Sequence, residues 1–282
     1  MEKLIDLHVH TTASDGTLSP RETAALDRKL GLAAIAVTDH DTAAGVDQAL
    51  AAGAELGVEV VPGIELAAEY EGRSVHILGY FIDPSAPGLR QALDRLVRER
   101  ERRNEKIVAA LAADGFDISM DRLRGACPDA VLGRPHIAAW LARQGRAASV
   151  EDAFHRYLDR GRPYYRAREH MPLRQATGAI RAAGGLASAA HPLQYGFAPE
   201  ALERFLLAAR EAGCQALEAC YSKYSPAEQQ TLRRTADRLG LAVSGGSDFH
   251  GDRKPDIRMG SGIGGGLRVP YAVLEGLRAL RK

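Results

Sequence analysis

The chain has 282 residues, of which 45% are hydrophobic and 26% are charged, a composition typical of a globular protein with a sizeable core. Its 37 Lys and Arg residues nearly balance 36 Asp and Glu residues, which argues against nucleic-acid binding through bulk charge. Three cysteines without C-x-x-C spacing indicate neither a disulfide framework nor a cysteine zinc site. Because we find no signal peptide and no apolar run of about 18 residues, we expect a cytoplasmic protein that does not bind membranes.

The first predicted strand, residues 4–10 in the stretch LIDLHVHTTASDG, carries two histidines one residue apart. Side chains alternate between the two faces of a strand, so Asp6, His8 and His10 share one face while the apolar residues share the other. Asp15 follows five residues after His10. A half-buried strand with its polar residues in water explains this pattern as well as a metal site does, so the rest of the chain must decide.

Helices and strands then alternate regularly. The sequence SPRE predicts the start of a helix, with Ser19 as its cap and Glu22 completing a capping box, and Gly31 predicts its end. The strand LAAIAVTDH, a short helix that ends near Gly57 and the strand VEVVPGIE come next. This order is typical of parallel βα units.

The alternation fails between Glu65 and His76, where the connection is too short for a crossover helix. We predict a hairpin of strands 66–70 and 73–80 with its turn at Glu71-Gly72. The later strands GGLASAAH, CQALEACY and LAVSGGSDFH adjoin amphipathic helices, one of which begins with a second capping box at residues 225–228. The predicted fold class is α/β, a distorted seven-stranded (β/α) barrel, although periodicity alone also allows an open sheet.

Between residues 96 and 168 the helix–strand rhythm stops, and stretches such as RPHIAAWLARQG and VEDAFHRYLDRG predict helices. We therefore predict a barrel domain of residues 1–95 and 169–282, and a helical insertion of residues 96–168 that acts as a lid and in substrate specificity. The interspersed charges of RERERRNEK predict a solvated helix face. The glycine-rich GSGIGGG lacks the ending of a phosphate loop, and we expect a mobile loop there.

Residues suited to metal binding fall at the ends of the predicted strands. In a parallel barrel, the carboxyl ends of the strands lie at one face, where active sites form. That face would hold six of the nine histidines of the chain and three carboxylates, namely His8, His10, Asp15, His40, Glu65, His76, His191, Asp248 and His250. A single histidine in such a place is more often structural, but this number at strand ends predicts a metal centre.

Imidazoles and carboxylates without a thiolate favour a catalytic centre of zinc, manganese or iron over a closed structural zinc site. Nine donors exceed what one ion can use, so we predict two to three divalent ions, with Mn²⁺ first and Zn²⁺ or Fe²⁺ as alternatives. Glu65 and Asp248 are the candidates to contact more than one ion. Asp39 and Asp41, which flank His40, either orient ligating imidazoles or cap the loop.

The motifs DLHVHTTASDG, TDHD, GIE, VHILGY, AHP and SDFH, in this order, resemble those of the polymerase and histidinol phosphatase (PHP) family of trinuclear-metal phosphoesterases. The resemblance implies the distorted barrel, and all nine ligand positions of the family are filled here. The segment GRPHIA in the insertion is similar to one branch, the nucleoside 3′,5′-bisphosphate phosphatases related to the 5′-to-3′ exoribonuclease RNase AM.

This resemblance implies a phosphoric ester hydrolase that removes the 3′-phosphate of nucleoside 3′,5′-bisphosphates with a metal-activated water. Glu65, Asp248 and His191 are then the catalytic residues. Short RNA, or the 5′ ends of RNA, would be a further substrate. Another PHP phosphatase, such as one for histidinol phosphate, is the alternative enzyme, and a metal-binding structural module is the alternative without activity.

Cationic side chains outside the donor set are the candidates for substrate binding. Arg134 and His136 in the insertion and Lys223 after the sixth strand can each contact a phosphate. A structural role, such as an ion pair for Arg134, remains the alternative for each of them. We expect a small nucleotide as the substrate and find no sign of an obligate protein partner.

Overall fold

The computed structural model describes residues 2–128, 130–167 and 171–281. The chain forms two compact units, one of Met1–Leu93 with His170–Lys282 and the other of Asp94–Glu169. The long helix α3 (Pro87–Ala113) begins in the first unit and continues into the second. The sequence places the corresponding parts at residues 1–95 with 169–282 and at residues 96–168.

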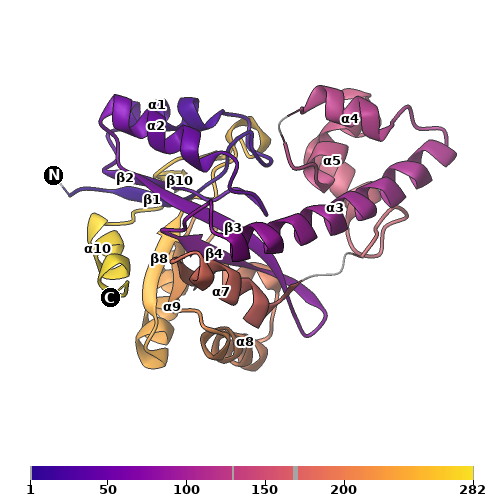
Figure 1. The fold of residues 1–282 in the computed structure, drawn as a ribbon. Coiled ribbons are helices and arrows are strands. Elements are labelled where there is room, and N and C mark those ends of the chain that lie inside the picture. The colour runs from indigo at the N-terminus through magenta and orange to yellow at the C-terminus, as the bar shows by residue number, and fades with distance from the viewer. Residues whose placement is uncertain (1, 129, 168–170, 282) are drawn as a thin grey trace. The chain divides into compact units, whose positions relative to one another are not determined.

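The first unit is a mixed α/β barrel, as the sequence predicts (Figure 1). Its sheet has the order β1 (Ile5–Val9), β2 (Ala34–Val37), β3 (Val60–Tyr70), β4 (Arg73–Tyr80), β6 (Leu186–Ala189), β7 (Ala216–Tyr221) and β8 (Ala242–Gly246). The short strand β5 (Met171–Pro172) pairs with β3 outside this order. Neighbouring strands are parallel except at β4, which is antiparallel to both β3 and β6.

The predicted hairpin of β3 and β4 is confirmed. Glu71 and Gly72 form the turn between the strands, with φ values of 48° and 71°, and such positive values at both central residues are those of a type I′ turn. Because β4 runs against its neighbours, its first residues lie at the rim where the neighbours end. Pairing of Ala67 with His76 therefore brings this histidine to the carboxyl ends of the parallel strands.

Helices of the first unit pack on the strands. They are α1 (Pro20–Leu30), α2 (Val46–Leu56), α7 (Leu173–Ala182), α8 (Pro199–Ala212), α9 (Pro226–Leu239) and α10 (Tyr271–Ala279), with short 3₁₀ turns at Pro192–Tyr195 and Gly251–Arg253. Figure 1 shows α1 and α2 side by side. Both predicted capping boxes are confirmed, since the N–H of Glu22 donates to the Ser19 hydroxyl and that of Glu228 to the Ser225 hydroxyl. These caps fix the starts of α1 and α9.

The sheet closes between β1 and the segment after β8. The main-chain N–H of Asp248 donates to the His8 carbonyl oxygen at 2.8 Å, and the N–H of His10 donates to the Phe249 carbonyl oxygen at 2.9 Å. Position 246 requires glycine at this seam, because a Cβ on Gly246 would lie 2.3 Å from the backbone nitrogen of His8. The closure thus places the residues after β8 against the end of β1.

The glycine-rich segment 260–266 is not a plain loop, contrary to the sequence prediction. It contains the short strand β10 (Gly262–Ile263), which pairs with β9 (Ile257–Arg258). Its first residue is held by buried Asp6, whose carboxylate accepts from the N–H of Gly260 at 2.7 Å and from the N–H of Ser247 at 2.8 Å. One carboxylate of β1 therefore ties this segment to the barrel seam.

The second unit is helical and has an apolar core of its own. Besides most of α3 it contains α4 (Met120–Ala126), α5 (Arg134–Arg143) and α6 (Val150–Ala153), which continues as a π turn at Phe154–Leu158. Ile107 and Leu111 of α3 pack in one buried cluster with Ile137 and Leu141 of α5.

In the described part of the chain, no helix is both long and apolar enough to cross a membrane.

The prediction of a solvated face for RERERRNEK is wrong in part. Arg100, Arg103 and Asn104 are buried, although their neighbours Arg102 and Glu105 are not. The Asn104 amide donates to the carbonyl oxygen of Leu132 at 2.8 Å, so this face of α3 holds the chain segment that leads into α5. Charge interspersion cannot reveal which face of a charged helix meets a later segment.

Candidate metal centre

Nine side chains that can bind metal gather at the rim where the parallel strands end. β1 contributes one of them, the loops after β1, β2, β6 and β8 contribute six, and β3 and β4 one each. They form four overlapping groups in which the potential ligand atoms lie within 4.8 Å of one another: His10, Asp15, His40 and His250; His8, Glu65 and His191; His8, His10 and Asp248; His40, Glu65 and His76. The sequence-predicted donors are therefore all brought together.

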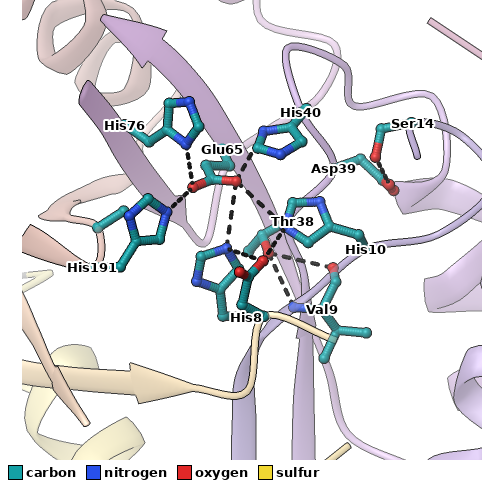
Figure 2. Close-up of polar contacts among 12 residues, drawn as sticks. His8, Val9, His10, Ser14, Thr38, Asp39, His40, Glu65, His76 and His191 are labelled. Carbon is teal, nitrogen blue, oxygen red and sulfur yellow. Dashed lines mark hydrogen bonds and ion pairs between the residues drawn. The ribbon is translucent and has the colours of Figure 1, made fainter. Parts of the chain in front are cut away.

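Glu65 lies at the centre of the cluster and is fully buried (Figure 2). Its Oε1 atom lies 2.9 Å from Nδ1 of His76 and 2.8 Å from Nε2 of His191. Its Oε2 atom faces other imidazoles, at 2.9 Å from Nδ1 of His40 and 3.3 Å from Nε2 of His10. Two carboxylate oxygens that face two sets of imidazoles suit a ligand that bridges two cations.

Asp15 belongs to a group on another side of the cluster. Its Oδ1 atom lies 3.3 Å from Nε2 of His250 and 3.9 Å from Nδ1 of His10. The rings of His10 and His250 stack with their centroids 4.1 Å apart. His40 completes this group, which gives three imidazoles and one carboxylate around one position.

The two oxygens of Asp248 have different partners. Oδ1 faces the cluster, at 3.4 Å from Nε2 of His10 and 3.4 Å from Nδ1 of His250. Oδ2 accepts hydrogen bonds from the hydroxyl of Tyr221 and from Nζ of Lys254, each at 2.7 Å. The residue also has φ of 59°, a conformation that non-glycine residues adopt rarely and that clusters at functional sites.

Several polar atoms of the cluster are buried without a hydrogen-bond partner among the described residues. They are Nε2 of His8, both ring nitrogens of His10, Oε2 of Glu65 and Nδ1 of His191. Burying an unsatisfied polar atom is unfavourable, and native structures seldom leave one without a reason. Nitrogen and carboxylate lone pairs that converge in one buried place are satisfied by cations, so the donor set fits a metal centre.

The protonation states of most donors suit metal binding. Burial alone would raise the pKa of Glu65, but the surrounding imidazoles hold it well below its ordinary value. Burial alone would also raise the pKa of Asp248, but Lys254 and His250 outweigh that effect and hold it well below its ordinary value. Burial lowers the pKa of His76 to about 4, and burial with Lys254 does the same for His250. Ionised carboxylates and neutral imidazoles are the states that metal ligands require.

His8 and His10 depart from this pattern. Burial lowers the pKa of His8, but Glu218 and Glu65 overcome that effect and raise it well above its ordinary value. Burial lowers the pKa of His10, but the nearby carboxylates of Asp248 and Glu65 overcome that effect and raise it to about 9. The proton on this ring balances the negative charge of the two carboxylates. A cation between the same groups would replace that proton, because metal binding releases protons from its ligands.

Comparison with known proteins identifies the family. The model of the PHP domain matches residues 6–238, a range that includes seven of the nine donors and ends before Asp248 and His250. The chain belongs to the PHP domain family. The last two donors of this PHP domain lie beyond the matched range and are brought to the others by the seam between β8 and β1.

Three similar proteins illustrate the PHP family. A 3′,5′-nucleoside bisphosphate phosphatase of Chromobacterium violaceum is 34% identical over 247 residues, which cover 87% of this chain and 87% of that protein. A 5′-3′ exoribonuclease of Haemophilus influenzae is 34% identical over 250 residues, covering 89% of this chain and 91% of that protein. The crystal structure of a protein of Bifidobacterium adolescentis, described as a metal-dependent phosphoesterase, superposes with a TM-score of 0.86 at 31% identity, covering 98% of this chain and 96% of that one.

The acidic residues that flank His40 in the PHP motif TDHD hold loops. Asp39 accepts a hydrogen bond from the N–H of Thr11 at 2.8 Å. It accepts another from the hydroxyl of Ser14 at 2.5 Å (Figure 2). Asp41 accepts from the N–H of Ala67 at 2.8 Å. The sequence allows Asp39 and Asp41 either to orient ligating imidazoles or to cap the loop. These contacts favour the second role, because the two carboxylates fix the loop after β1 and the start of the hairpin.

Sequence reasoning missed three residues next to the donors. Glu218, in the middle of β7, accepts a hydrogen bond from Nδ1 of His8 at 2.8 Å; Tyr221 and Lys254 hold Asp248. A single acid inside the otherwise apolar strand ALEACY is a signal that could have singled out Glu218. No comparable signal marks Lys254, whose place depends on the turn after β8.

The residues predicted to bind substrate lie in both units. Lys223 is exposed in the turn after β7. In the second unit, the Arg134 guanidinium donates to the Leu158 carbonyl oxygen at 3.3 Å and faces the ring of Tyr165. His136 is buried, and its Nδ1 accepts from the N–H of Gly133 at 3.0 Å, so it caps the first turn of α5. The substrate-binding role of these three residues stays a prediction.

Proposed function

We propose that this PHP protein is a metal-dependent phosphoesterase that hydrolyses the 3′-phosphate of nucleoside 3′,5′-bisphosphates. The observation that carries the proposal is the largely buried cluster of nine donors with Glu65 at its centre, in which unsatisfied nitrogen and oxygen atoms converge. The substrate class is supported by the Chromobacterium violaceum relative, which is named for this activity and matches over most of both chains.

The proposed cofactors are two to three divalent ions. The donor groups overlap through shared residues, and Glu65 offers one oxygen to each of two imidazole sets, which supports more than one ion. Imidazole and carboxylate donors suit Mn²⁺, Zn²⁺ and Fe²⁺; Mn²⁺ is the first choice. The proposed ligands are His8, His10, Asp15, His40, Glu65, His76, His191, Asp248 and His250.

In the proposed reaction, water attacks the phosphorus atom, the bond to the ribose 3′-oxygen breaks, and that oxygen takes up a proton. Divalent ions in the centre would polarise the phosphoryl oxygens and lower the pKa of the attacking water. Glu65 holds the two sides of the centre at a fixed separation. His191 and Asp248 complete it from the segments after β6 and β8, and these three residues are the proposed catalytic residues.

Substrate selection is assigned to cationic groups and to the insertion. The proposed domains are a barrel of residues 1–95 and 169–282, which carries the metal centre, and an insertion of residues 96–168, which selects the substrate. Arg134 would bind the phosphate that is not cleaved, as a guanidinium can do with two parallel hydrogen bonds. His136 and Lys223 are the further proposed substrate contacts.

A second candidate function is hydrolysis of RNA from its 5′ end. The Haemophilus influenzae relative, equally similar, is named a 5′-3′ exoribonuclease. Both reactions break a bond between phosphorus and a ribose 3′-oxygen, so one centre can serve a small nucleotide and a short RNA. We expect that neither reaction requires a protein partner.

An assay of the Mn²⁺-loaded protein tests the proposal. Adenosine 3′,5′-bisphosphate, histidinol phosphate and a short 5′-phosphorylated RNA are supplied in parallel, and phosphate and nucleotide products are measured. The proposal expects phosphate and adenosine 5′-phosphate from the bisphosphate; mononucleotides from the RNA support the second function. Faster release from histidinol phosphate contradicts the substrate class, and no hydrolysis of any substrate supports a structural module instead.

A further inference from the structure

Glu218 binds two of the proposed ligands from a strand that supplies none. It lies in β7, is fully buried, and uses both carboxylate oxygens. Oε1 accepts a hydrogen bond from Nδ1 of His8 at 2.8 Å, and Oε2 accepts one from the main-chain N–H of His191 at 2.6 Å. These residues come from β1 and from the segment after β6, so one carboxylate connects two separate parts of the rim.

The first bond determines which nitrogen of His8 is available. A proton on Nδ1 is held by Glu218, so the lone pair lies on Nε2. That atom faces Oε2 of Glu65 at 3.4 Å and is buried without a hydrogen-bond partner among the described residues. A carboxylate behind a histidine fixes its tautomer and ring orientation and makes the facing nitrogen a stronger ligand.

The second bond holds a strained backbone. His191 has φ of 24° and ψ of 56°, a conformation that residues with a side chain rarely adopt and that the surroundings must enforce. Its N–H points at Glu218, and its Nε2 lies 2.8 Å from Oε1 of Glu65. Without the acceptor, the backbone would lose a partner that keeps the imidazole directed at Glu65.

We propose that Glu218 is a positioning residue for one metal position, the one formed by His8, Glu65 and His191. The proposal rests on the metal centre of the proposed function. Glu218 should act mainly on this metal position, because it accepts hydrogen bonds from both histidines of the group. The group of His8, His10 and Asp248 shares only His8, and the group of His10, Asp15, His40 and His250 contains neither histidine.

The substitution Glu218→Gln tests this role with a side chain of the same size. A glutamine offers one oxygen where the carboxylate offers two, so its NH₂ group must face either the N–H of His191 or Nδ1–H of His8. We expect one metal equivalent to dissociate at a 10- to 100-fold lower chelator concentration than in the wild type. The other equivalents should keep their affinity. Metal content is measured by elemental analysis after dialysis against graded chelator.

Ser188→Ala is the matched control. Ser188 is buried in β6, next to β7, and its hydroxyl shares a hydrogen bond of 2.8 Å with that of Ser244. Its loss should leave all metal equivalents unchanged. Unchanged metal retention in Glu218→Gln overturns the proposal. The proposal is also overturned if every metal equivalent is lost equally easily and the chelated variant melts at a lower temperature than the chelated wild type. That result would indicate a merely structural residue.

A measurement on the wild type tests the same role without a variant. In the Zn²⁺-loaded protein, ¹⁵N NMR should place the proton of His8 on Nδ1; a proton on Nε2 overturns the proposal. The wild-type metal content separates this proposal from the proposed function. At most one equivalent in metal-replete protein defeats the multinuclear centre itself, whereas two to three equivalents with an unaffected Glu218→Gln variant defeat only the role of Glu218.

Discussion

Lys254 and Asp248 form an ion pair in which Nζ lies 2.7 Å from Oδ2. The hydroxyl of Tyr221 donates to the same oxygen at 2.7 Å, so Oδ1 alone is directed at His10 and His250. The Lys254 side chain is 35% exposed, which places a positive charge at the edge of the donor cluster. As a proposed ligand, Asp248 would therefore offer one oxygen to a metal ion.

Replacing Lys254 with Met should lower kcat/KM without removing any of the proposed metal ligands. The Asp248 carboxylate would keep Tyr221 but lose a charge-assisted hydrogen bond, whose typical worth of about 1.5–3 kcal/mol corresponds to roughly 10- to 100-fold in kcat/KM. Lys254→Arg, which keeps the charge, should recover part of the loss. Lys29→Met on the exposed end of α1 is the control, and an equal effect of the two Met variants on phosphate release would contradict this role.

Substitution of the metal-binding donors themselves should reduce turnover far more than substitution of Lys254. Glu65→Ala removes the carboxylate that faces both imidazole sets, and Asp248→Ala removes a proposed ligand from the segment after β8. Each should lower turnover by orders of magnitude. His155 is exposed in the second unit, and His155→Ala should leave the rate nearly unchanged. Steady-state phosphate release measures all three. Comparable losses at all three positions would show that the centre is misassigned.

Much of this centre could be predicted because its ligands follow local rules. Alternation along β1 puts His8 and His10 on one face, and a histidine or carboxylate at the end of a strand reaches the rim of any parallel barrel. The hairpin that brings His76 to the same rim was also predictable, since the connection after Glu65 is too short for a crossover. Such inferences need only sequence spacing and the direction of the chain.

The residues behind the ligands could not be predicted in the same way. Glu218 meets His8 across 210 positions of sequence, and the contact exists because β7 neighbours β8, which closes against β1. Local pattern carries no information about that neighbour. The burial of Arg100 in α3 has a similar origin, because a charged helix does not show which of its faces a later segment will cover.

Metal removal should abolish activity and reveal the stoichiometry. Nine donors in overlapping groups exceed the coordination of one ion, so elemental analysis of metal-replete protein should give two to three equivalents. A strong chelator should eliminate phosphate release, and Mn²⁺ should restore it. Activity that survives complete chelation, or a stoichiometry that stays at one or below, would contradict the multinuclear centre.

The stability of the barrel should depend on pH through Asp27. Its side chain is buried in α1, and neither carboxylate oxygen has a hydrogen-bond partner among the described residues. Burial and then the charge of Asp6 raise its pKa from 3.8 to about 7. Between these pH values the unfolded chain has released a proton that the folded chain retains, so the free energy of unfolding falls as the pH rises from about 4 to about 7.

Asp27→Asn should remove this dependence. At about 1.4 kcal/mol per pKa unit, the variant should exceed the wild type by on the order of 2–4 kcal/mol at pH 8 and match it near pH 4. Denaturant unfolding of chelated protein across this range measures the difference. Asp47→Asn, at an exposed position in α2, should leave the wild-type curve unchanged. A gap between Asp27→Asn and wild type that is the same at pH 4 and pH 8 would contradict the raised pKa.

Arg134 offers a test of substrate choice. Its guanidinium is partly buried at the start of α5, between the rings of Phe154 and Tyr165 at 5.7 Å and 5.8 Å. Burial lowers its pKa, because a charge removed from water is costly unless an anion balances it. In the described ranges its hydrogen bond goes to the neutral carbonyl group of Leu158, and the nearby Asp159 offsets only part of the effect of burial. A substrate phosphate would supply further negative charge.

Arg134→Ala should therefore impair bisphosphates more than simple monophosphates. If Arg134 binds the phosphate that is not cleaved, the loss should be roughly 10- to 100-fold in kcat/KM for adenosine 3′,5′-bisphosphate, from a charge-assisted contact of about 1.5–3 kcal/mol. A monophosphate without the second group should lose little. Arg143→Ala, at the exposed end of the same helix, should affect neither substrate. An equal loss on both substrates would instead assign Arg134 to the reacting phosphoryl group, since only that group is common to the two.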